Sequence, residues 1–386
     1  MADEAPRALR LGERNAGIDS LRGLSILLVV VHHVALRIPL QQTALADHVP
    51  KRVLSGLAYN GYEAVFVFFV VSGFLIASHS IARWGSLAAI DIRAFYMRRF
   101  ARIAPCLLAL VGVLSLMHLG GVPQYVIKGE GQSLAGAALS ALGLCLNWYE
   151  GKTGWLPGGW DVLWSLSIEE VFYLAFPLLC RLLRDRRALV AALGLLALSL
   201  PFARAALASN EIWQEKAYLP GMAAIAMGVL AALAARRFAA NGRVAIALCV
   251  TGGLGLLSVF FAGDLLWRAL RDGMMLVLTL SAACLVLGFH WRHAASKAPL
   301  PGLGWLRSCG RLSYEIYLTH MFVVFGLVAC FKAAGASMRS GFWWYLPAVA
   351  LSWLLGALVA RAFSEPANRA LLARWAREPR AVLAAK

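Results

Sequence analysis

The fold of this chain is decided by one segment near its N-terminus, Ile18-Asp-Ser-Leu-Arg22-Gly-Leu-Ser-Ile-Leu-Leu-Val-Val-Val-His32-His33. It belongs to an apolar stretch over 18–38 that is long enough to cross a bilayer as a helix. Of the 386 residues, 60% are hydrophobic and 15% are charged. Soluble domains are about 45–50% apolar and about 25% charged. The sequence therefore predicts a membrane protein.

Ten apolar segments of spanning length follow one another almost from end to end. They cover 18–38, 62–81, 100–119, 162–183, 189–207, 217–235, 244–262, 267–289, 312–332 and 342–363. This pattern predicts an all-α, polytopic helical bundle with no soluble second domain. We expect a tail over 1–17, one membrane domain over 18–366 and a basic tail over 367–386. The first span is too long for a signal-peptide core and has no clear cleavage site, so we expect it to be retained.

The net charge of +17 is better explained by membrane topology than by nucleic-acid binding, because the basic residues lie in short loops between apolar segments. An eleventh apolar segment, 134–148, is shorter and rich in Ala and Gly. If it crossed the membrane, the basic cluster at 181–187 would lie opposite most other Lys and Arg residues. We therefore expect a re-entrant or interfacial segment there, and both termini in the cytoplasm of a bacterium.

The first span carries two ionisable groups on one face. Eleven residues at about 100° each come within about 20° of three full turns, which places Arg22 and His33 about 16 Å apart along that face. Asp19, one turn before Arg22, is positioned to pair with it. In the alternative interpretation, Arg22 is a topological anchor and His33 is an interhelical hydrogen-bond partner. Ionisable residues inside spans more often mark a functional path.

The second and third spans add a serine and a basic run. A Ser72-Gly73 pair inside a helix lets another helix approach closely, so packing explains it as well as function does. The basic run also has two interpretations. It can mark the cytoplasmic side of the membrane, or its guanidinium groups can bind a phosphate-rich ligand. Its arginines are Arg93, Arg98, Arg99 and Arg102. The seven cysteines are scattered without metal-ligand spacing, so we expect free thiols and no metal site.

Polar residues also occur in two later spans. Glu169 and Glu170 follow Trp164 near the start of one span, and His320 lies inside another. Counting about 1.5 Å per residue places His33 about 18 Å from the cytoplasmic edge and Glu169 about 10 Å from the opposite edge. In a core about 30 Å thick these depths nearly coincide, and His320 lies only slightly nearer the cytoplasm. We therefore expect the three side chains to converge near mid-membrane, with a structural hydrogen bond as the alternative role for His320.

These residues resemble the motifs of membrane-bound acyltransferase family 3. Arg22 and His33, with ten residues between them, resemble the hallmark pair of that family. Four further matches follow in order along the chain: Phe68-Phe69-Val-Val-Ser72-Gly73-Phe74, Arg98-Arg99-Phe-Ala-Arg102-Ile-Ala-Pro105, Trp164-Ser165-Leu166 through Glu169 to Phe172-Tyr173, and Ser313-Tyr314 to His320. Ser364-Glu365-Pro366 resembles the motif that often closes the family domain.

The chain departs from the family pattern in two ways. Many members have an acidic residue where this chain has Phe66, so no carboxylate role is expected there. No extracytoplasmic domain of the SGNH type follows the last span. We therefore expect a stand-alone acyltransferase domain that transfers directly or is completed by a separate protein.

The resemblance implies transfer of an acyl group, usually acetyl, from cytoplasmic acyl-coenzyme A to a hydroxyl of a carbohydrate or lipid-linked glycan at the inner membrane. Arg22 and the basic run would bind the nucleotide phosphates, and His33 would take the proton of the acceptor hydroxyl. Glu169 would either orient His33 or bind the acceptor. A reaction through a transient acyl-histidine intermediate is an alternative that stays open. The remaining candidate site residues are Asp19, Ser72, Trp164, Tyr173, Tyr314 and His320.

Two rival functions stay open at this point. Intramembrane His, Arg and Glu residues also serve proton-coupled transporters and flippases. Such proteins often contain internal repeats with broken helices, and the sequence shows no convincing repeat. The second rival keeps the chemistry but uses a succinyl donor or a small-metabolite acceptor.

Overall fold

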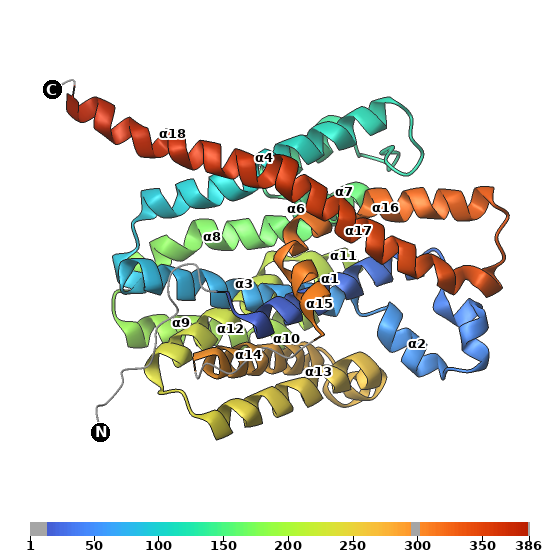
Figure 1. Ribbon diagram of the computed structural model, residues 1–386. Helices are drawn as coiled ribbons and strands as arrows, with labels where there is room; N and C mark the ends of the chain where they lie inside the picture. The colour runs from blue at the N-terminus through green and yellow to red at the C-terminus, as the bar shows by residue number, and fades with distance from the viewer. Residues whose placement is uncertain (1–13, 295–301, 385–386) are drawn as a thin grey trace.

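The computed structural model describes residues 14–294 and 302–384, and in these ranges it contains helices and no strand. Most helices lie roughly parallel and form one bundle (Figure 1). Within the described residues, nine helices are long and apolar enough to cross a membrane, and one bent pair makes up to ten. The predicted class, an all-α polytopic membrane bundle, is therefore confirmed. Of the predicted N-terminal tail, residues 1–13 lie outside the described residues.

The predicted spans correspond to helices in the same order. They are α1 (Ala16–Ala35), α3 (Gly61–Trp84), α4 (Ile92–Leu119), α8 (Trp164–Leu182), α12 (Tyr218–Arg237), α13 (Gly242–Leu270), α14 (Gly273–Ala294), α16 (Ser313–Ala333) and α17 (Tyr345–Val359). The span predicted at 189–207 is the bent pair α9 (Arg186–Leu198) and α10 (Leu200–Ala206), with a bend of 43°. Shorter helices at the bundle ends are α2 (Lys51–Ala58), α7 (Gly158–Asp161), α11 (Glu211–Lys216) and α15 (Gly304–Arg311). A long α18 (Glu365–Ala384) follows α17 after a π-helical turn.

One predicted boundary is wrong. The spans predicted over 244–262 and 267–289 leave a connection over 263–266, but α13 continues to Leu270 with a kink at Ala262. The chain turns instead at Arg271, which has a φ of 50°. Asp264 is exposed and pairs with Arg52 of α2 at 2.9 Å, so the helix can continue past this carboxylate without burying it.

The segment predicted to be re-entrant does not form a spanning helix. It divides into α5 (Leu134–Leu142) and α6 (Leu146–Thr153), with Leu144 between them at a φ of 58°. Each helix is far shorter than a membrane crossing requires. Its position relative to the lipid stays a prediction.

A buried lysine holds this segment to the bundle. Lys216 forms ion pairs with Asp161 of α7 and with Glu150 of α6, the latter at 2.9 Å. Asn147 also donates to the Lys216 carbonyl oxygen at 3.0 Å. Because buried charges are costly without partners, these contacts fix α6 and α7 against the end of α11.

Two close approaches between helices position the residues of interest. A Cβ atom on Gly73 of α3 would lie 1.9 Å from the Ile225 carbonyl oxygen of α12, so only glycine permits this contact. A Cβ atom on Gly310 of α15 would lie 1.8 Å from the Asp19 carbonyl oxygen of α1. The first contact supports the packing interpretation of the Ser72-Gly73 pair. The second brings the end of α15 and the start of α16 beside Arg22.

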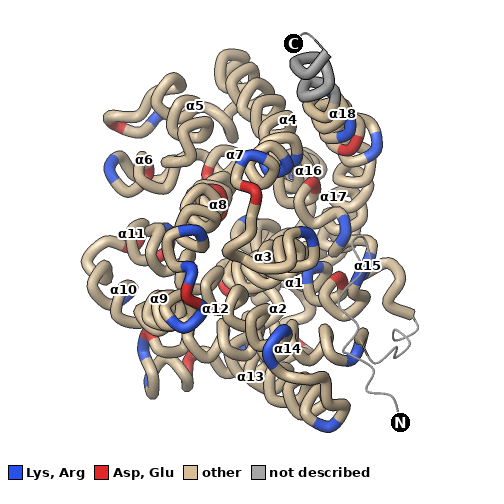
Figure 2. The backbone as a smooth tube through the Cα atoms, turned by 90° about the vertical axis from the view of Figure 1, so that its left-hand side faces the viewer, with Lys and Arg blue, Asp and Glu red and all other residues tan. Residues whose placement is uncertain are grey.

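Basic residues gather at the end of the bundle where α1 begins, which we call the amino-terminal end. The helices α3, α8, α12 and α14 finish at this end, and each has basic residues in its last turn. Figure 2 views the molecule from this end and shows Lys and Arg on α9, α14 and α15. This distribution is the one that a cytoplasmic face carries in membrane proteins.

We predict that Gly73→Ala destabilises the bundle, because the added methyl group forces α3 and α12 apart. Overpacking of this kind costs about 1–3 kcal/mol. The matched control is Gly112→Ala in α4, where an added Cβ meets nothing within 4 Å. Thermal unfolding in detergent should show a lower midpoint for Gly73→Ala only. Equal midpoints for the two variants would contradict the close-packing account.

Candidate active site

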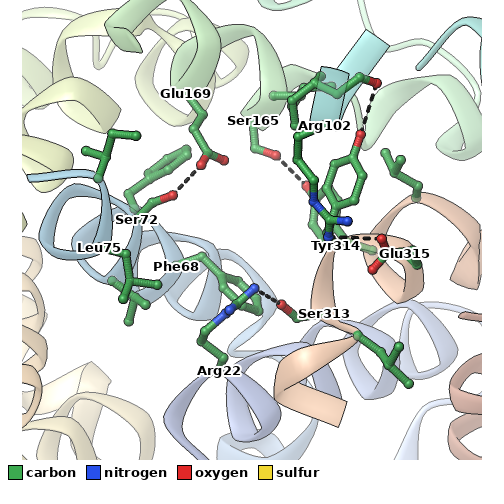
Figure 3. A pocket seen from close by; sticks show the side chains of 18 of the residues that line it. Arg22, Phe68, Ser72, Leu75, Arg102, Ser165, Glu169, Ser313, Tyr314 and Glu315 are labelled. Atoms are coloured by element: carbon green, nitrogen blue, oxygen red, sulfur yellow. Dashed lines mark hydrogen bonds and ion pairs between the residues drawn. The ribbon is translucent and has the colours of Figure 1, made fainter. Parts of the chain in front are cut away.

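A cavity of about 390 Å³ lies inside the bundle and reaches its amino-terminal end. Its walls come from α1, α3, α4, α8 and α16, with Arg14, Arg311 and Glu365 at the amino-terminal end. Basic and acidic side chains from different helices face one another across it (Figure 3). The arginines that line it are Arg14, Arg22, Arg99, Arg102 and Arg311, and the carboxylates are Glu169, Glu315 and Glu365.

Arg22 lies on the α1 wall of the cavity. Its guanidinium donates to Ser313 Oγ, at the start of α16, at 2.8 Å. Asp19 was expected to pair with Arg22, but the hydrogen bond of Arg22 goes to Ser313, while Asp19 is buried where α15 packs on α1. Arg22 has further N–H donors that can reach a ligand in the cavity.

Three oxygen-bearing side chains form a connected group on α3 and α8, which we call the α3–α8 network: Ser72, Glu169 and Tyr173. Ser72 Oγ donates to Glu169 Oε1 and lies 2.6 Å from Tyr173 Oη. Tyr173 donates to the same carboxylate oxygen at 2.8 Å. Behind the network, the Arg99 guanidinium lies 3.9 Å from the Tyr173 ring centre and forms an ion pair with Glu170.

A second connected group joins α4 and α16 to the C-terminal helices. Arg102 pairs with Glu315 at 2.9 Å, and its guanidinium lies 4.9 Å from the Tyr314 ring centre. Ser364 donates to Glu315 at 2.7 Å and accepts from Arg102 at 3.2 Å. Ser364 ends the π-helical turn Ala360–Ser364, and such turns are frequent at functional sites because they redirect side chains.

Two histidines meet just beyond the cavity. His33 Nδ1 lies 2.9 Å from the Val29 carbonyl oxygen and 3.3 Å from His320 Nε2. His320 Nδ1 lies 2.7 Å from the Tyr317 carbonyl oxygen. Tyr317 lines the cavity, and its ring centre is 5.9 Å from that of His320. The Tyr317 hydroxyl accepts from Ser165 at 2.7 Å and donates to the Val162 carbonyl oxygen. Because Tyr317 lines the cavity and its ring is next to His320, this ring lies between the cavity and the histidines.

The structure divides the candidate residues into groups. Those that line the cavity are Arg22, Ser72, Arg99, Arg102, Glu169, Tyr173 and Tyr314. His33 and His320 form the adjacent pair, and Trp164 stacks on Tyr62 at 6.2 Å. Arg93 and Arg98 are exposed on α4 and do not belong to the lining.

The expected convergence of three polar groups holds for the two histidines only. Glu169 contacts Ser72, Tyr173 and Arg99, whereas the ring beside His33 is that of His320. Depth was counted on a span of 18–38, but α1 ends at Ala35, so His33 lies in its last turn. Counting residues also fixes depth without fixing the face of each helix.

Several cavity residues were not singled out as candidates. Ser165, Ser313 and Tyr317 lie in stretches that resemble family motifs, but their contacts depend on which helices meet. Glu315 could have been singled out, because a carboxylate inside a span is costly without a partner. Within the parts of the chain that the structure describes, no group of three or more His, Cys, Asp and Glu residues could hold a metal ion.

The cavity combines cationic donors near the amino-terminal end with apolar walls further in. Five guanidinium groups and three carboxylates line it, and two of the carboxylates already contact arginines of the lining. Guanidinium groups bind phosphates through paired hydrogen bonds. The apolar walls suit a long, uncharged arm, and the histidine pair lies at the far side of Tyr317.

We predict that Glu315→Gln lowers the stability of the protein. Glu315 is 1% exposed, forms an ion pair with Arg102 and accepts a hydrogen bond from Ser364. Glutamine keeps an acceptor oxygen but carries no charge, so Arg102 loses its ion-pair partner, a loss that costs about 3–5 kcal/mol when the pair is buried. Thermal unfolding should show this loss, while Glu130→Gln in an exposed loop should unfold like the unaltered protein. Unchanged stability in Glu315→Gln would refute the proposed importance of this pair.

The fold and this cavity define a class of protein, a polytopic integral membrane protein with a polar cavity inside its helical bundle. A family model described as an acyltransferase domain, that of acyltransferase family 3, matches residues 15–362. The match covers most of the chain, and the chain therefore belongs to this family.

Two curated relatives match shorter stretches. The peptidoglycan O-acetyltransferase OatA of Listeria monocytogenes is 27% identical over 168 residues, which cover 42% of this chain and 23% of the relative. The O-acetyltransferase OatA of Staphylococcus aureus is 29% identical over 181 residues, 44% of this chain and 25% of the relative. The chain therefore spans about a quarter of the length of these relatives. No solved structure matches the chain.

Proposed function

We propose that this protein is a membrane-bound O-acyltransferase that moves an acyl group, most simply acetyl, from acyl-coenzyme A to a hydroxyl of a carbohydrate or lipid-linked glycan. The observation that carries the proposal is the arginine-lined cavity that extends from the amino-terminal end of the bundle to Tyr317, beside His33. Family membership and the O-acetyltransferase relatives support the reaction class.

The dimensions of the cavity support coenzyme A as the donor. Its lining on α3 runs from His79 to Val65, which is about 21 Å at 1.5 Å per residue. The phosphates would lie among Arg14, Arg22 and Arg311, and the thioester would lie near the closed end. Arg93 and Arg98 would contact the nucleotide from the exposed surface of α4.

His33 is the proposed general base, and its hydrogen bonds favour one tautomer. A carbonyl oxygen can only accept, so His320 Nδ1 carries a proton toward Tyr317 and its Nε2 is an acceptor. His33 Nδ1 faces two acceptors, Val29 O and His320 Nε2, and must carry a proton as well. The basic lone pair of neutral His33 is then on Nε2, free to accept the proton of a hydroxyl.

The reaction follows from these positions. The acceptor oxygen attacks the thioester carbon while its proton moves to His33 Nε2. The bond between carbon and sulfur breaks, and the coenzyme A thiolate takes the proton from the imidazolium. In the alternative sequence His33 Nε2 attacks first, and a transient acyl-histidine passes the acyl group to the acceptor.

The proposed location is a bacterial inner membrane with both termini in the cytoplasm. Basic last turns on four helices at the amino-terminal end support this orientation. The donor cavity would then be open to cytoplasmic acyl-coenzyme A. The acceptor would reach His33 from the opposite side of Tyr317.

We predict that His33→Gln abolishes transfer, because the replacement cannot take up a proton. Loss of a general base lowers rates by about 10²–10⁴-fold. The purified protein in proteoliposomes should release coenzyme A from acetyl-coenzyme A in the presence of a cell-envelope glycan extract, and His33→Gln should not. Succinyl-coenzyme A in the same assay tests the donor class.

The matched control is His32→Gln, because His32 is the neighbouring histidine and packs against Gly61 and Tyr59 instead of His320. It should retain transfer. Normal acylation by His33→Gln would contradict the proposed base, and absence of coenzyme A release from the unaltered protein with all donors would favour a transporter.

A further inference from the structure

We infer that the α3–α8 network binds the outer amide of the pantetheine arm of the donor, and that it acts in donor binding rather than in the bond-making step. This inference rests on the proposed acyl-coenzyme A donor. The network is the hydrogen-bonded set of Ser72, Glu169 and Tyr173 inside the cavity.

The position of the network along the cavity is the first argument. Ser72 lies midway between His79 and Val65 on the α3 wall, about 10 Å from either end. A thioester at the closed end, beside Tyr317, would therefore be about 10 Å beyond Ser72. The contacts of the network are with one another and with Arg99 and do not include His33, so we place the network in donor binding.

The spacing of amides in the arm is the second argument. The cysteamine unit has as many backbone bonds as an amino-acid residue, whose extended reach is about 3.3–3.6 Å, and the β-alanine unit has one methylene group more. Together they place the outer amide nitrogen about 9 Å from the sulfur. This distance matches the separation between the closed end and Ser72, whereas the inner amide falls beside the aromatic ring of Phe68.

The chemistry of the network is the third argument. The Ser72 and Tyr173 hydroxyls both converge on Glu169 Oε1, so Oε2 of this half-buried carboxylate is left to accept from another donor. An amide N–H is such a donor. The neighbouring lining of α3, Phe68, Val71 and Leu75, is apolar, so the network is the polar contact available to an uncharged arm at this level.

Three acetyl donors of decreasing length test the inference. Acetyl-coenzyme A and S-acetylpantetheine carry both amides, whereas S-acetyl-N-acetylcysteamine carries only the inner one. Ser72→Ala, Tyr173→Phe and Glu169→Gln should each raise KM for the two longer donors about tenfold or more and leave kcat nearly unchanged. With the short donor, each variant should match the unaltered protein in kcat/KM.

The matched controls are Ser25→Ala and Tyr96→Phe. Ser25 is a buried helical serine that donates to the Leu21 carbonyl oxygen, and the Tyr96 hydroxyl donates to the Leu174 carbonyl oxygen. Neither lines the cavity, so both variants should behave like the unaltered protein with all three donors. Thermal unfolding of every variant separates a binding defect from a folding defect.

Two results would overturn the inference. An equal loss of kcat with all three donors would place the network in the chemical step, and an acetyl adduct on Ser72 found by peptide mass spectrometry would make that serine a nucleophile. Both results leave the proposed function intact. Only the absence of acyl transfer by the unaltered protein with every donor would remove the proposed function itself.

Discussion

Charged side chains inside an apolar bundle are costly, and the structure depends on how this cost is met. Arg99 pairs with Glu170, Arg102 pairs with Glu315, and Lys216 lies between Glu150 and Asp161. Removing one partner of such a pair leaves an uncompensated buried charge, which costs several kcal/mol. The pairs therefore determine which helices can lie together, and in doing so they shape the cavity.

The arginines at the amino-terminal end of the cavity differ from these pairs in their surroundings. Arg22 contributes one hydrogen bond to the neutral Ser313, and two of the three carboxylates of the lining, Glu169 and Glu315, are engaged with Arg99, Arg102 and hydroxyl groups. This arrangement leaves positive charge at the amino-terminal end of the cavity. An anionic nucleotide would compensate it, which couples donor binding to the electrostatics of the fold.

The sequence predicted the helical class, the order of the spans and the residues that line much of the cavity. Long apolar segments and buried charges are strong local signals, and they identified Arg22, Arg102 and Glu169. The sequence predicted that His33 and His320 meet, but it also placed Glu169 beside them, because helical spacing gives depth but not the direction in which each side chain faces. Both Tyr317 and Ser364 lie in stretches that resemble family motifs, but their contacts depend on helix crossings and on a π-helical turn, which the sequence does not specify.

A structure in lipid nanodiscs with a non-hydrolysable thioether analogue of acetyl-coenzyme A tests the central claim most directly. The account predicts the diphosphate among Arg14, Arg22 and Arg311, the outer amide at the α3–α8 network, and the thioether sulfur beside Tyr317 on the side facing His33. A nucleotide bound outside this cavity, or an arm directed away from the histidine pair, would contradict it.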